Sequence, residues 1–168
     1  GNANYSTTSF SNTIIINKAT IPSPSWTANT FVYNGIAPSI TATYSTYNNQ
    51  IPANTFVTSS AAAGSYSFVF TVGNANYTTE TITNTIVINK AVVPSATWTA
   101  NTFTYNGISP SITATYSTYN NQIPANTFTT SSASVGSYPV SFTVGNNNYT
   151  TSTFTNTIVI NKATIPSV

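Results

Sequence analysis

Charged side chains are almost absent from this chain of 168 residues. They make up 2% of it, whereas about 25% is usual in soluble domains. The charged residues are Lys18, Glu80, Lys90 and Lys162. Three isolated lysines cannot neutralise a row of phosphates or an anionic bilayer surface. We therefore expect no nucleic-acid partner and no binding to anionic membranes.

Residues that usually perform catalysis or bind metals are missing too. The chain has no His, Cys, Met, Asp or Arg. A hydrolase triad would lack its general base, and the single carboxylate of Glu80 cannot form the pair that cleaves glycosides. Zinc would find no His or Cys, and calcium too few carboxylates. We expect no enzyme activity, no metal site and no cofactor.

Long hydrophobic runs are also absent. None approaches the roughly 18 residues that span a bilayer, so no membrane insertion is expected. No signal peptide stands at Gly1, so we expect a mature or internal piece of a longer chain. Without Cys, no disulfide stabilises the fold.

What the chain does contain is a repeat of fixed length. Lys18, Lys90 and Lys162 recur every 72 residues, and about three quarters of the positions in one copy are identical in the next. Such a period is typical of tandem arrays of one module. We predict complete repeats at 19–90 and 91–162, the last strand of a preceding repeat at 1–18, and the start of a further linker at 163–168.

Within each repeat, apolar residues alternate with small or polar ones, which is typical of β-strands. One strand is predicted at 65–72, with Tyr66, Phe68, Phe70 and Val72 on its inner face. Its second copy carries Pro139 on the other face, so this strand should lie at a sheet edge. Asn84 and Asn156 interrupt the last strand of each repeat, where we expect a hydrogen-bonded amide or a bulge.

The remaining strands are predicted at 102–105, 111–117 and 122–130. Asn34-Gly35 and Asn106-Gly107 indicate turns. Short strands with turns every 8–12 residues predict an all-β fold of tandem Ig-like antiparallel β-sandwich modules. The inward-facing candidates are Phe103, Tyr105, Ile112, Ala114 and Tyr116.

The segments between repeats are short, contain Pro and have no Gly/Ser run. A linker of this composition is semi-rigid and should hold successive modules at a constant orientation. Each Lys is expected to lay its stem over an aromatic ring such as Trp26 or Trp98; a Lys–Asn cross-link is the alternative. The linker residues are Lys18, Pro22, Lys90, Pro94, Lys162 and Pro166.

Residues 1–18 carry Phe10, Ile14 and Ile16 on one face, and a lone strand cannot bury such a face. Either the chain is a window on a longer repetitive protein, or this strand completes a neighbouring molecule. Both can hold.

Asn4, Asn76 and Asn148 each begin an N-glycosylation sequon, once per repeat. A glycan there would supply the solubility that charge does not. Alternatively, the Asn-Tyr pair forms a turn with a buried ring. The alternating threonines Thr79, Thr81, Thr83 and Thr85 could order water and bind ice, or they could simply suit an exposed strand face. The Tyr and Trp rings could stack on sugars or form the core.

Several ordered motifs resemble the MBG-type bacterial Ig-like repeat. They are Phe103-Thr-Tyr-Asn-Gly-Ile-Ser-Pro110, Ile112-Thr-Ala-Thr-Tyr116, Val135-Gly-Ser-Tyr138, Gly145-Asn-Asn-Asn-Tyr149 and Ile158-Val-Ile-Asn-Lys-Ala163. The resemblance covers essentially the whole chain. It implies tandem β modules of large secreted surface proteins and adhesins, which serve as stalk or contact glycans.

We therefore expect a non-catalytic structural repeat of an extracellular fibre, surface filament or adhesin stalk. Its expected partner is itself, in a fibre or tandem array. The alternative is a carbohydrate- or mucin-binding adhesin module at the cell surface, with a glycan as its partner.

Overall fold

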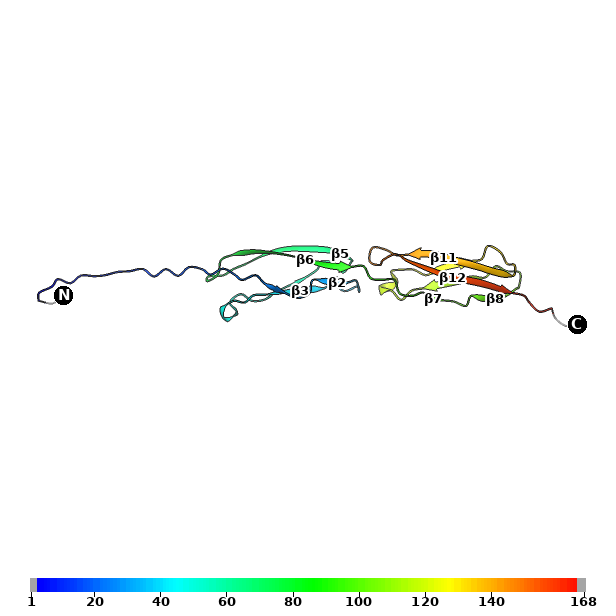
Figure 1. The fold of residues 1–168 in the computed structure, drawn as a ribbon, viewed down its shortest axis with the longest axis horizontal. Coiled ribbons are helices and arrows are strands. Elements are labelled where there is room, and N and C mark those ends of the chain that lie inside the picture. Colours follow the sequence, from blue (N-terminus) through cyan, green and yellow to red (C-terminus); the bar gives the residue numbers. More distant parts are fainter. Residues whose placement is uncertain (1–2, 166–168) are drawn as a thin grey trace.

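The computed structural model describes residues 3–165. Two β repeats lie end to end in an elongated molecule, with the termini at opposite ends (Figure 1). Residues 3–18 run outward from the first repeat as an extended segment. Pro166 lies outside the described residues.

Each repeat contains six strands in the same order. In the first repeat they are β1 (Ser25–Trp26), β2 (Thr30–Val32), β3 (Ser39–Thr43), β4 (Asn54–Val57), β5 (Gly64–Val72) and β6 (Glu80–Asn89). In the second they are β7 (Thr97–Trp98), β8 (Thr102–Thr104), β9 (Ser111–Thr115), β10 (Asn126–Thr129), β11 (Gly136–Val144) and β12 (Ser152–Asn161). A 3-10 turn precedes the fourth strand of each repeat, at Tyr47–Asn49 and at Tyr119–Asn121.

The strands of each repeat form two three-stranded sheets. The first repeat has the orders β1-β3-β4 and β2-β6-β5, and the second has β7-β9-β10 and β8-β12-β11. The first sheet of each pair is antiparallel, whereas β2 and β8 pair in parallel with β6 and β12. Both sheets turn their apolar faces toward one another, so the tandem β-sandwich predicted from the strand pattern is confirmed.

The core is formed by the apolar residues of the alternating strands. Ile40 and Ile86 are 1% exposed, and their second-repeat equivalents Ile112 and Ile158 are 0% and 1% exposed. Trp26 packs against Phe56 and Phe68 at ring-centroid distances of 6.1 and 5.8 Å. Every buried side-chain nitrogen or oxygen in the described part of the chain has a hydrogen-bond partner.

Predictions for the long strands hold in detail. On β5 the residues Tyr66, Phe68, Phe70 and Val72 face inward and their neighbours are exposed. Strand β11 lies at a sheet edge, as its Pro139 predicts. The amide of Asn156 is hydrogen-bonded, because its Oδ1 accepts from Asn101 Nδ2 at 2.9 Å and from the N–H of Thr157 at 2.8 Å.

The predictions for the shorter strands need correction. The segment at 111–117 is a strand only to Thr115, and the segment expected at 122–130 begins only at Asn126. Gln122 closes the 3-10 turn with a φ of −63° and a ψ of −20°, a helical conformation that a strand cannot contain. Tyr105, predicted to face inward, is 46% exposed.

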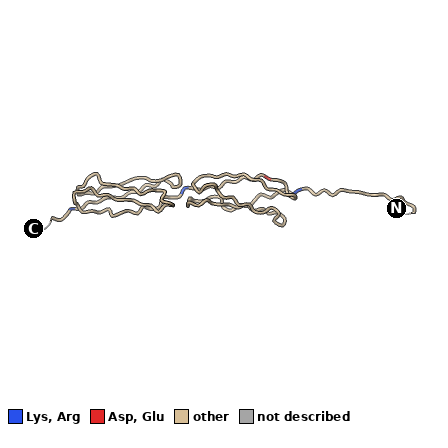
Figure 2. Tube along the Cα trace, turned by 180° about the vertical axis from the view of Figure 1, so that it is seen from behind, with Lys and Arg blue, Asp and Glu red and all other residues tan. Residues whose placement is uncertain are grey.

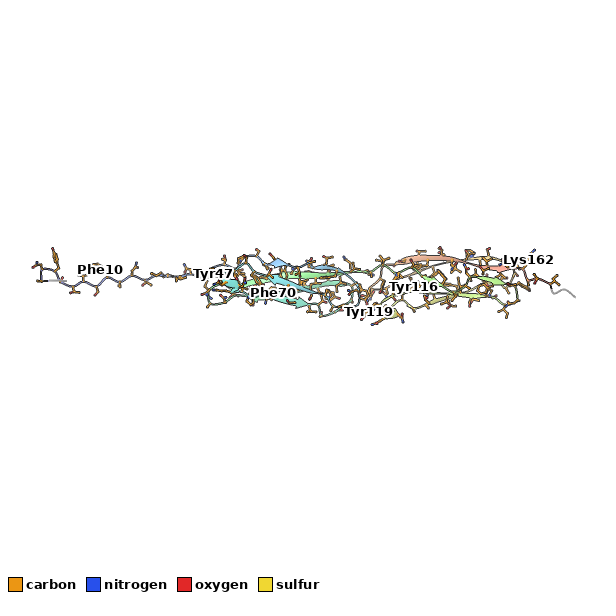
Figure 3. The ribbon with its side chains drawn as sticks, turned by 90° about the horizontal axis from the view of Figure 1, so that it is seen from below. Phe10, Tyr47, Phe70, Tyr116, Tyr119 and Lys162 are labelled. Carbon is orange, nitrogen blue, oxygen red and sulfur yellow. The ribbon has the colours of Figure 1, made fainter. Side chains whose placement is uncertain are left out.

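The N-terminal segment has the sequence of a buried strand but lies in solvent. Phe10, Ile14 and Ile16 are 93%, 88% and 91% exposed, and Figure 3 shows Phe10 well away from both repeats. Their equivalents on β12 include Ile158 and Ile160, at 1% and 2%. No helix among residues 3–165 reaches the length and apolarity needed to cross a bilayer.

Candidate functional site at the junction of the repeats

The turn that follows β2 places Tyr33 at the end of the first repeat that meets the second. The Tyr33 N–H donates to the carbonyl of Asn89 at 2.9 Å, which extends the pairing of β2 with β6 by one residue. Asn34 then closes the turn, because its Oδ1 accepts from the N–H of Ile36 at 3.0 Å. Gly35 supplies the φ of +80° that this turn needs and that glycine adopts without strain.

The second repeat receives Tyr33 in a recess that we call the junction pocket, formed by Tyr119, Gln122, Asn148 and Tyr149. Tyr119 begins the 3-10 turn at Tyr119–Asn121, and Gln122 follows this turn as its C-cap. The loop between β11 and β12 carries the other two. These elements are tied together because the Tyr119 N–H donates to the Tyr149 hydroxyl at 2.9 Å.

Tyr33 makes both apolar and polar contacts in this pocket. Its ring stands edge-on to the rings of Tyr149 and Tyr119, with centroid distances of 5.5 and 6.4 Å and interplanar angles of 77° and 87°. Gln122 Nε2 donates to the Tyr33 hydroxyl at 2.6 Å. Edge-to-face ring pairs contribute about 0.5–1.5 kcal/mol each beyond the area that they bury. Tyr33 is consequently 5% exposed.

Asn148 links the two repeats by a second route. Its Nδ2 donates to Gln122 Oε1 at 2.9 Å, which orients the Gln122 amide so that its nitrogen points at Tyr33. Its Oδ1 accepts from the N–H of Ala63, in the first repeat, at 2.9 Å. The amide of this sequon asparagine is thus engaged within the junction.

The linker between the repeats is hydrogen-bonded to the second repeat. Ala91 donates its N–H to the carbonyl of Asn148 at 2.9 Å, and its own carbonyl accepts from the N–H of Thr150 at 2.8 Å. Val93 is 4% exposed and belongs to the core. These bonds fix the direction in which the chain enters the second repeat.

The lysines do not lie over tryptophan as we had expected. Lys90 Nζ donates to the carbonyl of Asn146 at 2.9 Å, and Lys18 Nζ makes the equivalent bond to Asn74 at 3.0 Å. Lys18 and Lys90 therefore each hold the loop that carries an Asn-Tyr pair. Figure 2 shows the lysines at the ends of the repeats and between them. Trp26 and Trp98 pack instead against phenylalanines.

One apolar cluster continues through the junction. It includes Ile40 and Ile88 from the first repeat, and Ile123 and Tyr149 from the second. Tyr33 belongs to the same cluster. Because each repeat buries part of its apolar surface against the other, the contact adds to the stability of both, as nearest-neighbour terms do in repeat proteins.

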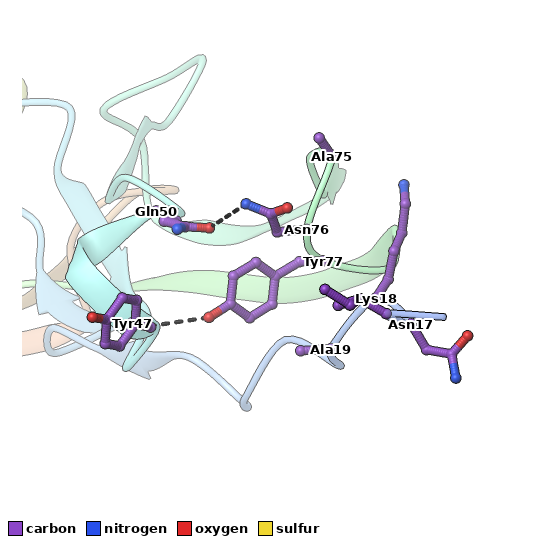
Figure 4. Close-up of a pocket in the computed structure, with 9 residues that line it drawn as sticks. Asn17, Lys18, Ala19, Tyr47, Gln50, Ala75, Asn76 and Tyr77 are labelled. Carbon is purple, nitrogen blue, oxygen red and sulfur yellow. Dashed lines mark hydrogen bonds between the residues drawn. The ribbon is translucent and has the colours of Figure 1, made fainter. Parts of the chain in front are cut away.

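The other residues singled out from the sequence are spread along the chain. Pro22 is exposed ahead of β1, Pro94 is half-buried ahead of β7, and Lys162 is exposed just after β12. Asn4 lies in the extended N-terminal segment, while Asn76 lies at the far end of the first repeat (Figure 4). Tyr77 and Tyr149, which follow the second and third sequon asparagines, are buried at 8% and 5%.

Tyr33 and Gln122 were not singled out from the sequence. Tyr33 lies in the same Tyr-Asn-Gly-Ile motif as Tyr105, and Gln122 was predicted to lie on a strand. One signal was present: the residues of the junction pocket are identical in both copies, although Ala75 is replaced by Asn147 beside them. This signal is weak, because about three quarters of all positions are identical between the copies.

The chemistry of the junction is that of recognition. Its polar groups are amides, phenols and backbone groups, with Lys90 at its margin. Among residues 3–165, no three His, Cys, Asp or Glu side chains come together as a metal site.

Comparison with known proteins supports the reading of the motifs. A family model described as MBG domain matches residues 26–92 and 95–164, so each repeat is matched once. The resemblance seen in the sequence is thereby confirmed. The family implies repeat modules of surface proteins, structural or binding in kind. No curated protein and no solved structure matches the chain.

Proposed function

Because this chain belongs to the MBG domain family, we propose that it is a structural stretch of an extracellular filament or of the stalk of a surface adhesin. The observation that carries this proposal is the burial of Tyr33 between Tyr119 and Tyr149. Modules joined by flexible linkers need no such contact, whereas modules held in a fixed relative orientation do. The repeats are thus joined so that they add length in one direction.

The strand arrangement suits a chain that is pulled from its ends. Within the first repeat, the chain enters at Ala19, which bridges to Tyr77 in parallel, and leaves at the end of β6, which pairs in parallel with β2. When two parallel strands are pulled from opposite ends, the hydrogen bonds between them are loaded in shear. Several bonds must then break together, which makes the repeat resist tension.

The low charge supports an exposed location. With four charged side chains in 168 residues, the stability of the fold should depend little on salt concentration or on moderate changes of pH. A near-neutral surface also offers little repulsion between neighbouring molecules. Both properties suit a filament whose surroundings vary.

The placement of the aromatic rings favours the structural role over glycan binding. Trp26, Trp98 and the phenylalanines beside them pack within the sandwich. Tyr33 and Tyr149 are used at the junction. Exposed rings for stacking on sugars are therefore confined mainly to the ends of the molecule.

Immunogold electron microscopy of the native material tests this proposal. Antibodies raised against the chain should label filaments or stalks outside the cell at regular intervals. Label confined to the cell interior would contradict the proposal, as would dispersed globular particles that bind a sugar saturably.

A further inference from the structure

Strand β5 forms the longest open edge of the first repeat. Within residues 3–165 it is nine residues long and pairs with β6 alone. The other strands at sheet edges of this repeat, β1, β2 and β4, have two to four residues. Short length, charged side chains and proline are the usual protection of an edge against pairing with another chain. Strand β5 has none of them, because its sequence is Gly-Ser-Tyr-Ser-Phe-Val-Phe-Thr-Val.

Hydrogen bonds on β6 show which backbone groups of β5 point to the open side. The N–H of Val87 donates to the carbonyl of Asn29 at 2.8 Å, away from β5. Val87 is also the ladder partner of Ser65. Since hydrogen-bonded and non-hydrogen-bonded pairs alternate in an antiparallel ladder, Ser65 and every second residue after it make no ladder bond to β6. The N–H and C=O groups of four residues therefore point to the open side: Ser65, Ser67, Val69 and Thr71.

The second repeat has the same edge on β11, but with a proline in it. The N–H of Val159 donates to the carbonyl of Asn101 at 2.8 Å, so its ladder partner Ser137 and every second residue after Ser137 point to the open side. Pro139 is one of these residues, and its ring stands where the N–H of another residue would be. Strand β11 is thus protected against pairing, whereas β5 has Ser67 at this position.

The two residues that follow this position differ in the same direction. Phe68 and Val69 of β5 correspond to Val140 and Ser141 of β11. Aromatic and β-branched side chains strengthen the pairing of one strand with another. Over three successive positions, the first repeat therefore has the residues that favour pairing and the second has residues that weaken or prevent it.

A groove lies beside the open edge of β5, between the two sheets. It has a volume of about 430 Å³, and its lining includes Phe56 of β4 with Tyr66 and Phe68 of β5. The Phe56 and Phe68 rings are stacked with their centroids 4.5 Å apart, and both are half-buried. A strand added to β5 brings its own inward-facing side chains over this groove, because alternate residues of a strand share one face.

We propose that β5 binds the β5 strand of a second copy of this chain in antiparallel orientation, so that two rods associate side by side. The strand Gly64–Val72 is centred on Phe68. When the two Phe68 residues face one another, Ser65 lies opposite Thr71 and Ser67 lies opposite Val69. Each outward N–H and C=O then has a partner on the other copy, and the two Phe68 rings meet beside the grooves.

Charge favours a second copy as the partner. Neither β4 nor β5 carries a charged side chain, and the whole chain has only four, so two copies repel one another little. Glu80 is the ladder partner of Val72, at one end of β5. Antiparallel pairing places the Glu80 carboxylates of the two copies at opposite ends of the contact, which keeps them apart.

The contact has a defined symmetry. It is isologous, so it closes at two copies and occupies both β5 edges. Because β5 runs along the long axis of the molecule, the paired rods point in opposite directions (Figure 1). Repeats like the first would then join neighbouring rods, whereas repeats with a proline equivalent to Pro139 would not. This inference goes beyond the filament role proposed above, because it concerns a contact that the isolated chain can form.

Sedimentation of the whole chain over a range of concentrations tests the proposal. A small contact of this kind should give a dimer with a dissociation constant on the order of 100 µM. Ser67→Pro gives β5 the proline that β11 carries, and it should weaken dimerisation at least tenfold while the chain stays folded. Ser67→Ala is the matched control, because alanine keeps the N–H although it loses the hydroxyl contact with Thr85. This variant should dimerise like the parent chain.

Disulfide cross-linking tests the register of the two strands. The chain has no Cys, so Ser67→Cys and Val69→Cys each carry a single thiol. Residues opposite one another in a hydrogen-bonded antiparallel pair have Cα atoms about 5.5 Å apart, a distance that a disulfide spans. Mild oxidation of a mixture of the two variants should therefore give mainly the mixed disulfide. The control is Ser67→Cys mixed with Ser141→Cys, which should give at least tenfold less, because Pro139 keeps β11 from pairing.

Several outcomes would overturn lateral pairing through β5. A chain that stays monomeric up to its solubility limit would do so, and so would a dimer that Ser67→Pro does not weaken. Loss of dimerisation in Ser67→Ala would assign the contact to the serine hydroxyl instead of the strand edge. Equal cross-linking in the mixture and in its control would place the contact elsewhere. The filament role is tested separately by the microscopy described above, so the two failures can be told apart.

Discussion

Gly35 and Tyr119 lie in direct contact across the junction, so closely that a Cβ at Gly35 would overlap the Tyr119 ring. Gly107 is the same residue of the second repeat, with nothing within 4 Å of the position of its Cβ. The φ values of the two glycines are +80° and +82°. Their backbones are alike, and only Gly35 has a neighbouring repeat against it.

This pair gives a direct test of the junction. Alanine at either glycine should cost about 1 kcal/mol because of the positive φ. Gly35→Ala should cost about 1 kcal/mol more, because the Tyr119 ring must move to make room. Urea unfolding of the two variants measures the difference. Equal losses of stability would show that the Gly35–Tyr119 contact contributes nothing.

The stability of each repeat should depend on the isoleucines between its sheets. Ile86 is 1% exposed, so Ile86→Ala should lower the free energy of unfolding by about 2–5 kcal/mol through lost burial and a cavity. The control is Val69→Ser, because Val69 is 65% exposed and the second repeat has Ser141 there. This change should stay within about 0.5 kcal/mol. Similar losses in both variants would contradict the placement of the core.

Stability should fall at alkaline pH. Burial raises the pKa of Tyr44 and of Tyr116 above the ordinary value of 10.0. In the folded state these phenols stay protonated while those of the unfolded chain ionise, so the unfolded state binds fewer protons. Their contribution is complete below pH 10 and declines as the pH rises through the raised values.

Unfolding free energies measured at pH 7, 9 and 10.5 check this dependence. The first two should agree and the third should be lower. Tyr44→Phe should reduce the decline, although it also removes the 3.1 Å bond to Asn54. A marked change between pH 7 and 9 would contradict the account.

The sequon asparagines should differ in their tolerance of a glycan. Asn148 uses both amide atoms inside the junction, whereas Asn76 is exposed at the outer end of the first repeat. Expression in a host that glycosylates should therefore leave the junction intact when Asn76 carries the sugar and disrupt it when Asn148 does. Peptide mass mapping with and without glycosidase, on folded monomer, should show Asn76 occupied well above Asn148. If Asn76 and Asn148 carried glycans equally often in molecules whose junction is intact, the placement of the Asn148 amide inside the junction would be contradicted.

The strands could be predicted from the sequence because their pattern depends only on residues that are close together in the chain. Alternation on β5 fixes which residues face inward, and the two copies show which face tolerates change, as at Ser67 and Pro139. The turn glycines follow from the need for positive φ at Gly35 and Gly107. These features depend on neighbours in the sequence.

The junction could not be predicted in the same way. Tyr33 and Tyr105 share their local sequence, yet one is buried and the other is exposed, because burial of Tyr33 depends on residues up to 116 positions away. The pocket also requires the 3-10 turn at Tyr119–Asn121, which leaves Gln122 in a helical conformation where a strand was expected to begin. Sequence patterning identified the repeats, whereas the contact between them required the three-dimensional structure.

Rigid coupling of the repeats through Tyr33 is tested most directly by the distance between two spin labels. The chain has no Cys, so Val69→Cys and Ser141→Cys, on equivalent exposed sites, place one label on each repeat. Double electron–electron resonance should give a single narrow distance distribution, which Tyr33→Ala broadens and Tyr105→Ala leaves unchanged. A broad distribution in the labelled parent chain, or one that Tyr33→Ala does not alter, would contradict the account.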